Sequence, residues 1–145
     1  MASGVYNIFK ERLAKDTINL TTDTLKVLLL GSGYTFDADH QFVSTTGVGT
    51  NEVAPTNYVR KTVTVTITRQ DASDRAVVII SQPTWTALGG ASNATIASAL
   101  LIKDTGSDAT SPLIANLDLS PSTLTTNGSD FTLTFDQTNG NVRLT

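Results

Sequence analysis

The chain has 145 residues, a formal net charge of −3 at pH 7 and 16% charged residues, against about 25% in typical soluble domains. It contains no Cys and a single His, which excludes disulfides, a thiolate nucleophile and metal sites built from several Cys or His. The ten Lys and Arg are spread along an acidic chain, which argues against a surface that follows nucleic-acid phosphates. No apolar run approaches the roughly 20 residues that span a membrane, so no membrane partner is expected.

Length and composition predict a single β domain over residues 1–145. The chain is rich in Thr and poor in Glu and Lys, and this balance favours strands over helices. The N-terminus lacks the basic start and apolar block of a signal peptide, so no secretory leader is expected. Without Cys chemistry or clustered His, the residues favour a protein that is not an enzyme and that needs no cofactor.

The first patterned segment is an N-terminal arm over residues 1–16, which is predicted to contain a short helix. Ser3 can serve as the N-cap, and the pattern continues to about Lys15, whose charge suits the negative end of a helix. So short a helix is marginal in water by itself, and its apolar side must pack on its own domain or on a neighbouring subunit. Four apolar residues recur on that side at helical spacing: Val5, Ile8, Phe9 and Leu13.

After residue 24 the apolar pattern becomes that of β-strands. Leu25–Leu30 is apolar on both faces after Lys26, which predicts a strand covered on both sides. Residues 34–57 lose this periodicity and are predicted to form a long loop, and loops above about 15 residues in a compact domain are usually functional or mobile. Its expected tethers to the core are Phe36, Phe42, Val43 and Val48.

The clearest hairpin is predicted between residues 59 and 80. Residues 59–68 alternate between mostly apolar and mostly Thr side chains, which predicts a strand with one apolar face and one Thr face. Turn residues at 70–74 lead into Arg75–Ile80, which is apolar on both faces and is therefore predicted to be a central strand. The Thr face is either solvent-facing or an interaction surface, and the first interpretation is favoured.

Shorter strands and turns are predicted in the rest of the chain. Strands are expected at residues 96–103, 113–119 and 131–135, with Trp85 closing one end of the core. Asn139-Gly140 is a strong signal for a two-residue hairpin that leads into a last strand at residues 141–145. About seven or eight such strands predict an antiparallel β-sandwich or barrel with a short N-terminal helix.

Two features could carry chemistry, and each has a simpler interpretation. His40 lies beside Asp37 and Asp39 in the long loop, but no nucleophile–histidine pattern surrounds it, so a solvated loop histidine is favoured. Three Asp-rich turns lack the spacing of a calcium loop and favour turn chemistry over a metal site; they lie at residues 71–74, 104–108 and 136–141. No catalytic, cofactor-binding or metal-ligating residue is therefore expected.

Several short stretches carry more information by their order than by their individual sequences. They are Tyr6-Asn7-Ile8-Phe9-Lys10-Glu11, Asp23-Thr24-Leu25-Lys26-Val27-Leu28-Leu29-Leu30, Gly33-Tyr34-Thr35-Phe36-Asp37-Ala38-Asp39-His40, Asn51-Glu52-Val53, Asp74-Arg75-Ala76-Val77, Pro83-Thr84-Trp85-Thr86-Ala87, Ala99-Leu100-Leu101-Ile102-Lys103-Asp104-Thr105-Gly106 and Ser111-Pro112-Leu113-Ile114-Ala115. Over nearly the whole chain they resemble a family of small virion structural proteins of tailed bacteriophages, which are similar to head decoration, or cement, proteins. Ala54-Pro55-Thr56-Asn57 departs from that pattern, because a Gly-containing turn is usual there.

The resemblance implies a non-enzymatic protein of the virion that binds the outer surface of the capsid, stabilises the head and is made in the cytoplasm of the bacterial host. Its implied partner is the major capsid protein or another virion protein. Homo-oligomers on the particle are also expected. A tail, connector or fibre-associated structural role is the alternative, and a carbohydrate-binding β-sandwich module is a more remote one.

The arm and the long loop are the segments expected to grip the capsid. Deletion of residues 1–9 should then abolish capsid binding and leave the β-fold intact. The expected interface residues are Val5, Tyr6, Ile8, Phe9, Leu13, Phe36 and Phe42.

Overall fold

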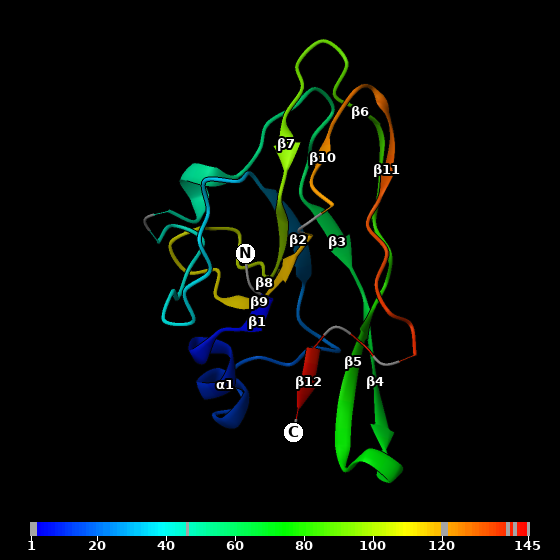
Figure 1. Ribbon diagram of the computed structural model, residues 1–145. Helices are drawn as coiled ribbons and strands as arrows, with labels where there is room; N and C mark the ends of the chain where they lie inside the picture. Colours follow the sequence, from blue (N-terminus) through cyan, green and yellow to red (C-terminus); the bar gives the residue numbers. More distant parts are fainter. Residues whose placement is uncertain (1–2, 46, 120–121, 139, 141, 145) are drawn as a thin grey trace.

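Antiparallel β-structure dominates the computed structural model, which describes residues 3–45, 47–119, 122–138, 140 and 142–144 (Figure 1). The expected fold class, mostly β with one short N-terminal helix, is confirmed. The described elements are, in chain order, β1 (Gly4–Val5), α1 (Asn7–Ala14), β2 (Leu25–Leu30), the single-turn 3-10 helix η1 (Gly49–Asn51), β3 (Lys61–Val63), β4 (Val65–Gln70), the 3-10 turn η2 (Asp71–Ser73), β5 (Arg75–Ile80), β6 (Thr84–Leu88), β7 (Thr95–Ile96), β8 (Ser98–Lys103), β9 (Leu113–Asp118), β10 (Leu124–Thr125), β11 (Ser129–Thr132) and β12 (Val142–Leu144).

The described strands form four antiparallel sheets. The largest has the order β1-β9-β8-β2-β3, and a three-stranded sheet has the order β12-β5-β4. Two further pairs, β6 with β11 and β7 with β10, rise together at the upper end of the molecule in Figure 1. None of these sheets closes into a barrel among the described residues, so the barrel alternative does not hold for them.

Alternation along β2 divides the interior into two cores. Leu25, Val27 and Leu29 face the main core. Leu28 and Leu30 face a second, smaller core on the opposite side of the same sheet. Because successive side chains of a strand point to opposite faces, a strand between two cores must be apolar at nearly every position. This confirms the prediction of a covered strand and explains the run of Leu residues.

The main core lies between the five-stranded sheet and strands β5 and β6. Val78 of β5 and Trp85 of β6 have no exposed surface. The Trp85 indole Nε1 donates to the Val59 carbonyl oxygen at 2.7 Å, and its ring stacks on Phe131 with centroids 5.6 Å apart. The predicted burial of Trp85 is confirmed, and its one polar atom is satisfied, as a buried indole requires.

The long loop covers the second core. Tyr34, Val43 and Val48 are buried there against β2 and β8, with Phe36 and Phe42 half-buried at its margin. Backbone hydrogen bonds fix both ends of the loop, from Gly31 N to Asn51 O and from Val53 N to Leu29 O. The expected tethers are confirmed, and the loop serves as the layer that shields one face of the sheet from water.

The N-terminal arm differs from the prediction in its first residues. Gly4 and Val5 form an edge strand that pairs with Asn116 and Ala115 of β9, so the helix begins only at Asn7. Ser3 is not its N-cap: its Oγ accepts a hydrogen bond from Asp118 N at 2.9 Å instead. The helical periodicity of the sequence does not indicate that residues 4 and 5 pair with β9, because β9 is more than 100 residues further along the chain.

The strand predicted at residues 59–68 divides at Thr64. Residues 61–63 pair with β2 in the five-stranded sheet, whereas residues 65–70 pair with β5 in the three-stranded sheet. The hairpin of β4 and β5 is confirmed, as is the central position of β5 between β4 and β12. Its turn uses η2 and places Asp74 in the left-handed region, with φ of 47°.

Two C-terminal predictions need correction. The strand expected at residues 96–103 is interrupted at Ala97, so that β7 pairs with β10 and β8 with β2 and β9. The last strand exists, but it pairs with β5, while β11 pairs with β6. Among the described residues, β11 and β12 therefore do not pair with each other as the predicted hairpin requires; Asn139 of the predicted turn lies outside the described residues.

Candidate functional site

The structure places the expected interface residues of the arm mainly inside the protein. Tyr6 and Phe9 have no exposed surface and Ile8 is 8% exposed. Val5 and Leu13 are half-buried and pack against the main core together with Phe9. Of the two possibilities left open for the apolar side of the helix, the structure therefore shows packing on its own domain. The buried side chains have no surface to offer a partner in this fold.

The arm and the long loop nevertheless contact each other and form one surface, which we call the arm–loop surface and define as residues 3–15 and 34–45. The rings of Tyr6 and Phe36 lie 5.1 Å apart between centroids. Asn7 donates from its backbone N to the Ala38 carbonyl oxygen at 2.9 Å and from Nδ2 to Asp39 Oδ1 at 2.7 Å. The arm and the long loop, the two segments expected from the sequence to grip the capsid, are thus joined by several independent contacts.

A cation–π contact and a close backbone approach complete this junction. The Arg12 guanidinium lies 5.4 Å from the centroid of the Phe42 ring, within the distance at which such pairs attract. A Cβ on Gly4 would lie 2.5 Å from the Phe36 ring, so the glycine allows the loop to pack directly on β1. Of the seven expected interface residues, Tyr6, Ile8, Phe36 and Phe42 meet at the second core, whereas Val5, Phe9 and Leu13 belong to the main core.

His40, expected to be a solvated loop histidine, is partly buried and ends a chain of hydrogen bonds. The hydroxyls of Tyr6 and Tyr34 lie 2.6 Å apart, and the Tyr34 hydroxyl lies 3.3 Å from His40 Nδ1. Burial raises the pKa of both tyrosines, and for Tyr6 the hydrogen bond with Tyr34 raises it further. Both hydroxyls therefore stay protonated at neutral pH, and the chain tethers the start of the loop to the arm.

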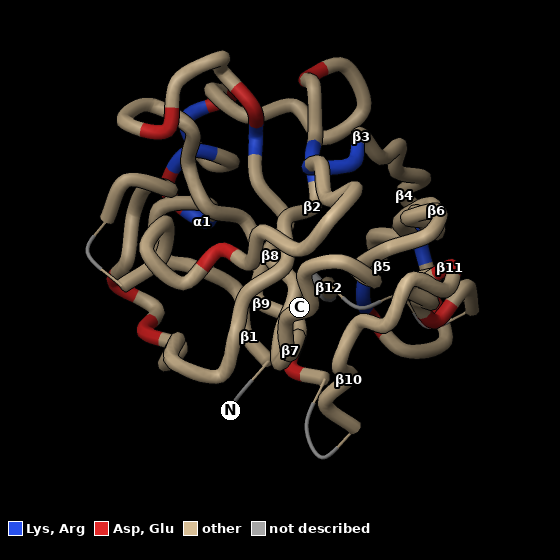
Figure 2. Tube along the Cα trace, turned by 90° about the horizontal axis from the view of Figure 1, so that it is seen from above, with Lys and Arg blue, Asp and Glu red and all other residues tan. Residues whose placement is uncertain are grey.

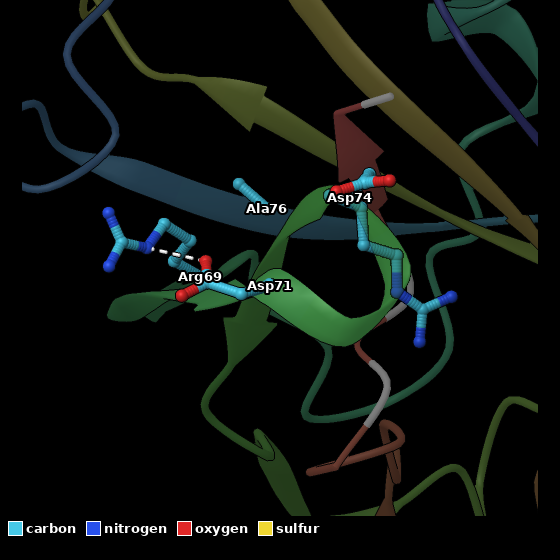
Figure 3. Close-up of a pocket in the computed structure, with 5 residues that line it drawn as sticks. Arg69, Asp71, Asp74 and Ala76 are labelled. Atoms are coloured by element: carbon cyan, nitrogen blue, oxygen red, sulfur yellow. Dashed lines mark ion pairs between the residues drawn. The ribbon is translucent and has the colours of Figure 1, made fainter.

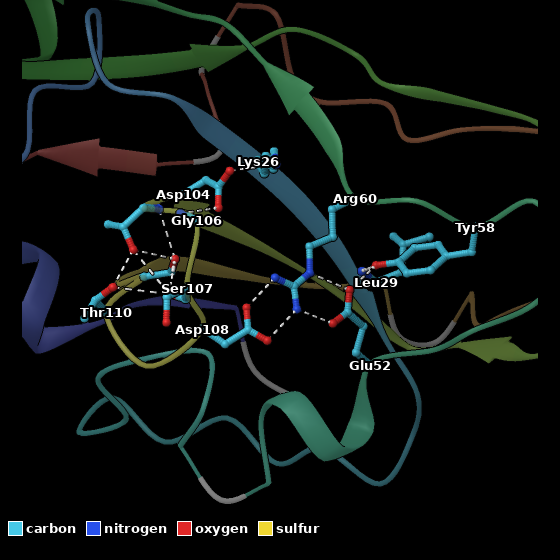
Figure 4. Close-up of polar contacts among 12 residues, drawn as sticks. Lys26, Leu29, Glu52, Tyr58, Arg60, Asp104, Gly106, Ser107, Asp108 and Thr110 are labelled. Atoms are coloured by element: carbon cyan, nitrogen blue, oxygen red, sulfur yellow. Dashed lines mark hydrogen bonds and ion pairs between the residues drawn. The ribbon is translucent and has the colours of Figure 1, made fainter.

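A second group of polar contacts, centred on Arg60, fixes the other end of the loop (Figure 4). The guanidinium donates to Glu52 from Nε at 2.8 Å and from Nη2 at 2.6 Å. It also donates to Asp108 from Nη1 at 2.6 Å and from Nη2 at 3.0 Å. Bidentate pairs of this kind are the strongest that arginine makes, and the Arg60 side chain is only 24% exposed.

Tyr58 extends this group of contacts to strand β2 of the five-stranded sheet. Its hydroxyl donates to Glu52 Oε1 at 2.7 Å and accepts from Leu29 N at 3.0 Å. Burial raises the pKa of Tyr58, and the negative charge of Glu52 adds to the rise. The resulting unit, which we call the Arg60 clasp and define as Glu52, Tyr58, Arg60 and Asp108, joins the long loop, strand β2 and the loop before β9.

The Arg60 clasp was not predicted from the sequence, although two signals were present. Arg60 is a charged residue at the start of the alternating segment of residues 59–68, and Glu52 is one of only two Glu in the chain. Neither signal identifies the partner, because Asp108 lies 48 residues beyond Arg60. Only the pairing of β2 with β3 and β8 brings the three segments together.

Acid is expected to weaken the contribution of Asp108 to stability. The hydrogen bonds from Arg60 hold the pKa of Asp108 below its ordinary value, so its stabilisation is present above about pH 3.9 and is lost as the pH falls through the lower folded value. Asp108→Asn should lower the free energy of unfolding by ~1 kcal/mol or less at neutral pH, because the carboxylate is half exposed. Urea unfolding of both proteins from about pH 7 to pH 2.5 should show the difference become smaller as the pH falls. A difference that persists in acid would mean that the Asp108 charge is not its cause.

The Asp-rich turns act as turns in the described residues. Carboxylate oxygens of Asp104 and Asp136 accept hydrogen bonds from the backbone N two residues further on, which is the usual role of Asp in a turn. In the turn at residues 71–74, Asp74 N donates to the Asp71 carbonyl oxygen at 3.3 Å. No group of three or more side chains of metal-binding type occurs in the part of the chain that the structure describes.

The tip of the β4–β5 hairpin carries an open hollow lined by charges of both signs (Figure 3). Arg69 pairs there with Asp71, Nε to Oδ1 at 2.7 Å, and both side chains are largely exposed. Arg75, Asp74 and Ala76 complete the lining. Acidic and basic residues are likewise interspersed around the described trace (Figure 2).

Aromatic side chains do not form an exposed platform of the kind that the carbohydrate-binding alternative needs. All five Phe, the three Tyr and the Trp lie among the described residues, and each is buried or half-buried. Phe131 is half-buried, and Phe135 is 5% exposed.

The helix that the structure describes is too short and too polar to cross a membrane. Comparisons with models of protein families, with curated proteins and with solved structures found no match to this chain.

Proposed function

We propose that the protein is a non-enzymatic structural component of a tailed-bacteriophage virion and that it binds the outer surface of the capsid as a decoration protein that stabilises the head. Its partner is the major capsid protein, and its copies associate with one another on the particle. The ordered resemblance along nearly the whole chain supports this proposal. A net charge of −3 is also consistent with it, because packaged DNA repels an acidic protein from the capsid interior.

The observation that supports the arm–loop surface as the binding surface is that the arm and the long loop are joined. Contacts of Asn7 with Ala38 and Asp39 hold the two segments together before any partner arrives. A surface that is already ordered loses little conformational entropy when it binds. The arm–loop surface is therefore suited to repeated attachment across a capsid, with no segment that must first fold.

Burial changes which residues of the arm–loop surface would touch the capsid. Tyr6, Ile8 and Phe9 support this surface from beneath. Among the residues that reach solvent on it, we propose five as the contacts: Asn7, Lys10, Asp37, Asp39 and Gln41.

The first experiment is the copy number of the protein relative to the major capsid protein, in purified virions and in heads separated from tails. A comparable number retained on tail-less heads would support decoration. A few copies that travel with the tails would replace it with the tail or connector role. Absence from particles would contradict any virion role.

Reversing a charge on the arm–loop surface should weaken capsid attachment. Lys10 is exposed on α1, so Lys10→Glu should leave the fold unchanged and reduce cosedimentation with undecorated capsids about tenfold, the effect of ~1.4 kcal/mol. The matched control is Lys61→Glu on β3, where the side chain is partly exposed and lies outside both the arm–loop surface and β4. Equal loss of binding in both variants would mean that total charge matters and that the arm–loop surface is not the attachment site.

A further inference from the structure

Strand β4 has an open edge that nothing in the described part of the chain covers. In the sheet order β12-β5-β4 it pairs on one side only, with β5. The other outer strands of the two larger sheets, β1, β3 and β12, have two or three residues each, whereas β4 has six. In Figure 1 the β4–β5 hairpin projects from the lower end of the molecule, away from α1.

The backbone groups that face this open edge can be assigned from the hydrogen bonds on the β5 side of the strand. Ser81 N donates to the Thr64 carbonyl oxygen at 2.9 Å, and Thr64 N donates to Ser81 Oγ at 3.0 Å, so Thr64 bonds toward the β5 side. Hydrogen-bonding positions alternate along an antiparallel strand. Thr66 and Thr68 therefore also bond to β5, while Val65, Ile67 and Arg69 direct their N–H and C=O groups outward.

The middle of β4 lacks the features by which proteins usually block an open edge. Val65, Thr66, Ile67 and Thr68 include no charge, no Pro and no Gly, and the register with β5 runs without a bulge from Val65 to Gln70. Charges, prolines and bulges are the common protections against edge pairing. Ile67 is 45% exposed, although its side chain is large and apolar.

We propose that β4 pairs antiparallel with β4 of a second copy of this chain, about a two-fold axis at Ile67, so that two three-stranded sheets join into one of six strands. The proposed function includes association between copies of the chain. This inference rests on that function and names the surface through which the copies associate. The pairing uses the outward backbone groups of Val65, Ile67 and Arg69. It also covers the exposed Ile67 side chain with its symmetry mate.

The side chains of β4 fit this two-fold arrangement. With Ile67 opposite Ile67, Thr66 lies opposite Thr68 on the other face, and Val65 lies opposite the stem of Arg69. The chain already pairs threonines across antiparallel strands in this way: Thr84 with Thr132, at 2.8 Å between hydroxyls, and Thr95 with Thr125, at 3.0 Å. The two Arg69 charges stand apart on opposite sides of the axis, so no like charges face each other.

The absence of Cys from the chain makes a crosslinking test specific. In the proposed register the two copies of residue 67 have Cα atoms about 5.5 Å apart, within the roughly 4.4–6.8 Å that a disulfide spans. The two copies of residue 65 are about 14 Å apart, because they lie on neighbouring strands and are offset by four residues along them. Mild oxidation should therefore convert Ile67→Cys to a disulfide-linked species of twice the 15.3 kDa mass, and leave Val65→Cys uncrosslinked.

Sedimentation equilibrium of the isolated protein supplies the second readout. The unmodified chain should show twice the monomer mass, and Ile67→Lys should return it to the monomer mass. Leu124→Lys is the matched control, because Leu124 is also an exposed aliphatic residue, at 38%, on a different strand. A monomeric unmodified chain, equal crosslinking through residues 65 and 67, or equal dissociation by both lysines would overturn the proposal. Since no capsid is present, failure here leaves the copy number on heads as a separate test of the decoration role.

Discussion

Replacing Phe9 by alanine is expected to lower the free energy of unfolding by about 3–5 kcal/mol, the usual result of truncating a buried aromatic side chain. Phe9 has no exposed surface and lies in the main core with residues of the five-stranded sheet. Helix α1 has only eight residues, too few to be stable in water without such packing. The variant should therefore lose both the buried area of the ring and the anchoring of the helix.

Chemical denaturation monitored by circular dichroism measures this change. The control is Lys10→Ala on the same helix, where the side chain is exposed and a change within ~0.5 kcal/mol is expected. A loss of stability in Phe9→Ala no larger than in the control would show that α1 does not contribute to the core. The same burial changes the outcome expected for deletion of residues 1–9, which should now destabilise the fold and cannot serve as a test of capsid binding.

Arg60→Ala is expected to cost about 2–3 kcal/mol of stability. The substitution leaves Glu52 and Asp108 without their shared cation, and Glu52 is largely buried beside Tyr58. Removing one partner of a buried ion pair is destabilising mainly because the remaining charge stays desolvated. The effect should lie below that of a fully buried pair, because Arg60 keeps 24% of its side-chain surface.

Arg69→Ala is the matched control for Arg60→Ala. It removes an arginine that is 82% exposed and pairs with an exposed carboxylate, so a change below ~0.5 kcal/mol is expected. Arg60→Lys should restore only part of the loss, since an ammonium cannot bond both carboxylates in bidentate fashion. Equal stability of the two alanine variants, measured by urea unfolding, would refute a structural role for the Arg60 clasp.

Local patterns predicted the elements whose neighbours are close in sequence. The hairpin of β4 and β5, the covered strand Leu25–Leu30 and the burial of Trp85 follow from alternation, turn residues and apolar runs, and the structure confirms them. In each case the competing conformations have a different period or expose a large apolar surface. Sequence reasoning is effective where such local signals agree.

Long-range pairing accounts for the predictions that failed. Nothing in the alternation of residues 59–68 indicates that β2 pairs with its first part and β5 with its second. Likewise, Gly4 and Val5 fit a helical pattern in the sequence, but in the structure they pair with β9. The Arg60 clasp is hidden for the same reason, because its carboxylates come from two loops on either side of the pairing strands.

The shared guanidinium of Arg60 also makes its two loops a single thermodynamic unit. If the loop that carries Glu52 opens locally, Arg60 loses two of its four hydrogen bonds to carboxylates and is held by Asp108 alone, and the converse holds for the loop that carries Asp108. Local opening events of this kind are cooperative when segments depend on a common contact. Motion at the far end of the long loop is thereby coupled to the segment before β9, and β9 itself pairs with β1 of the arm–loop surface.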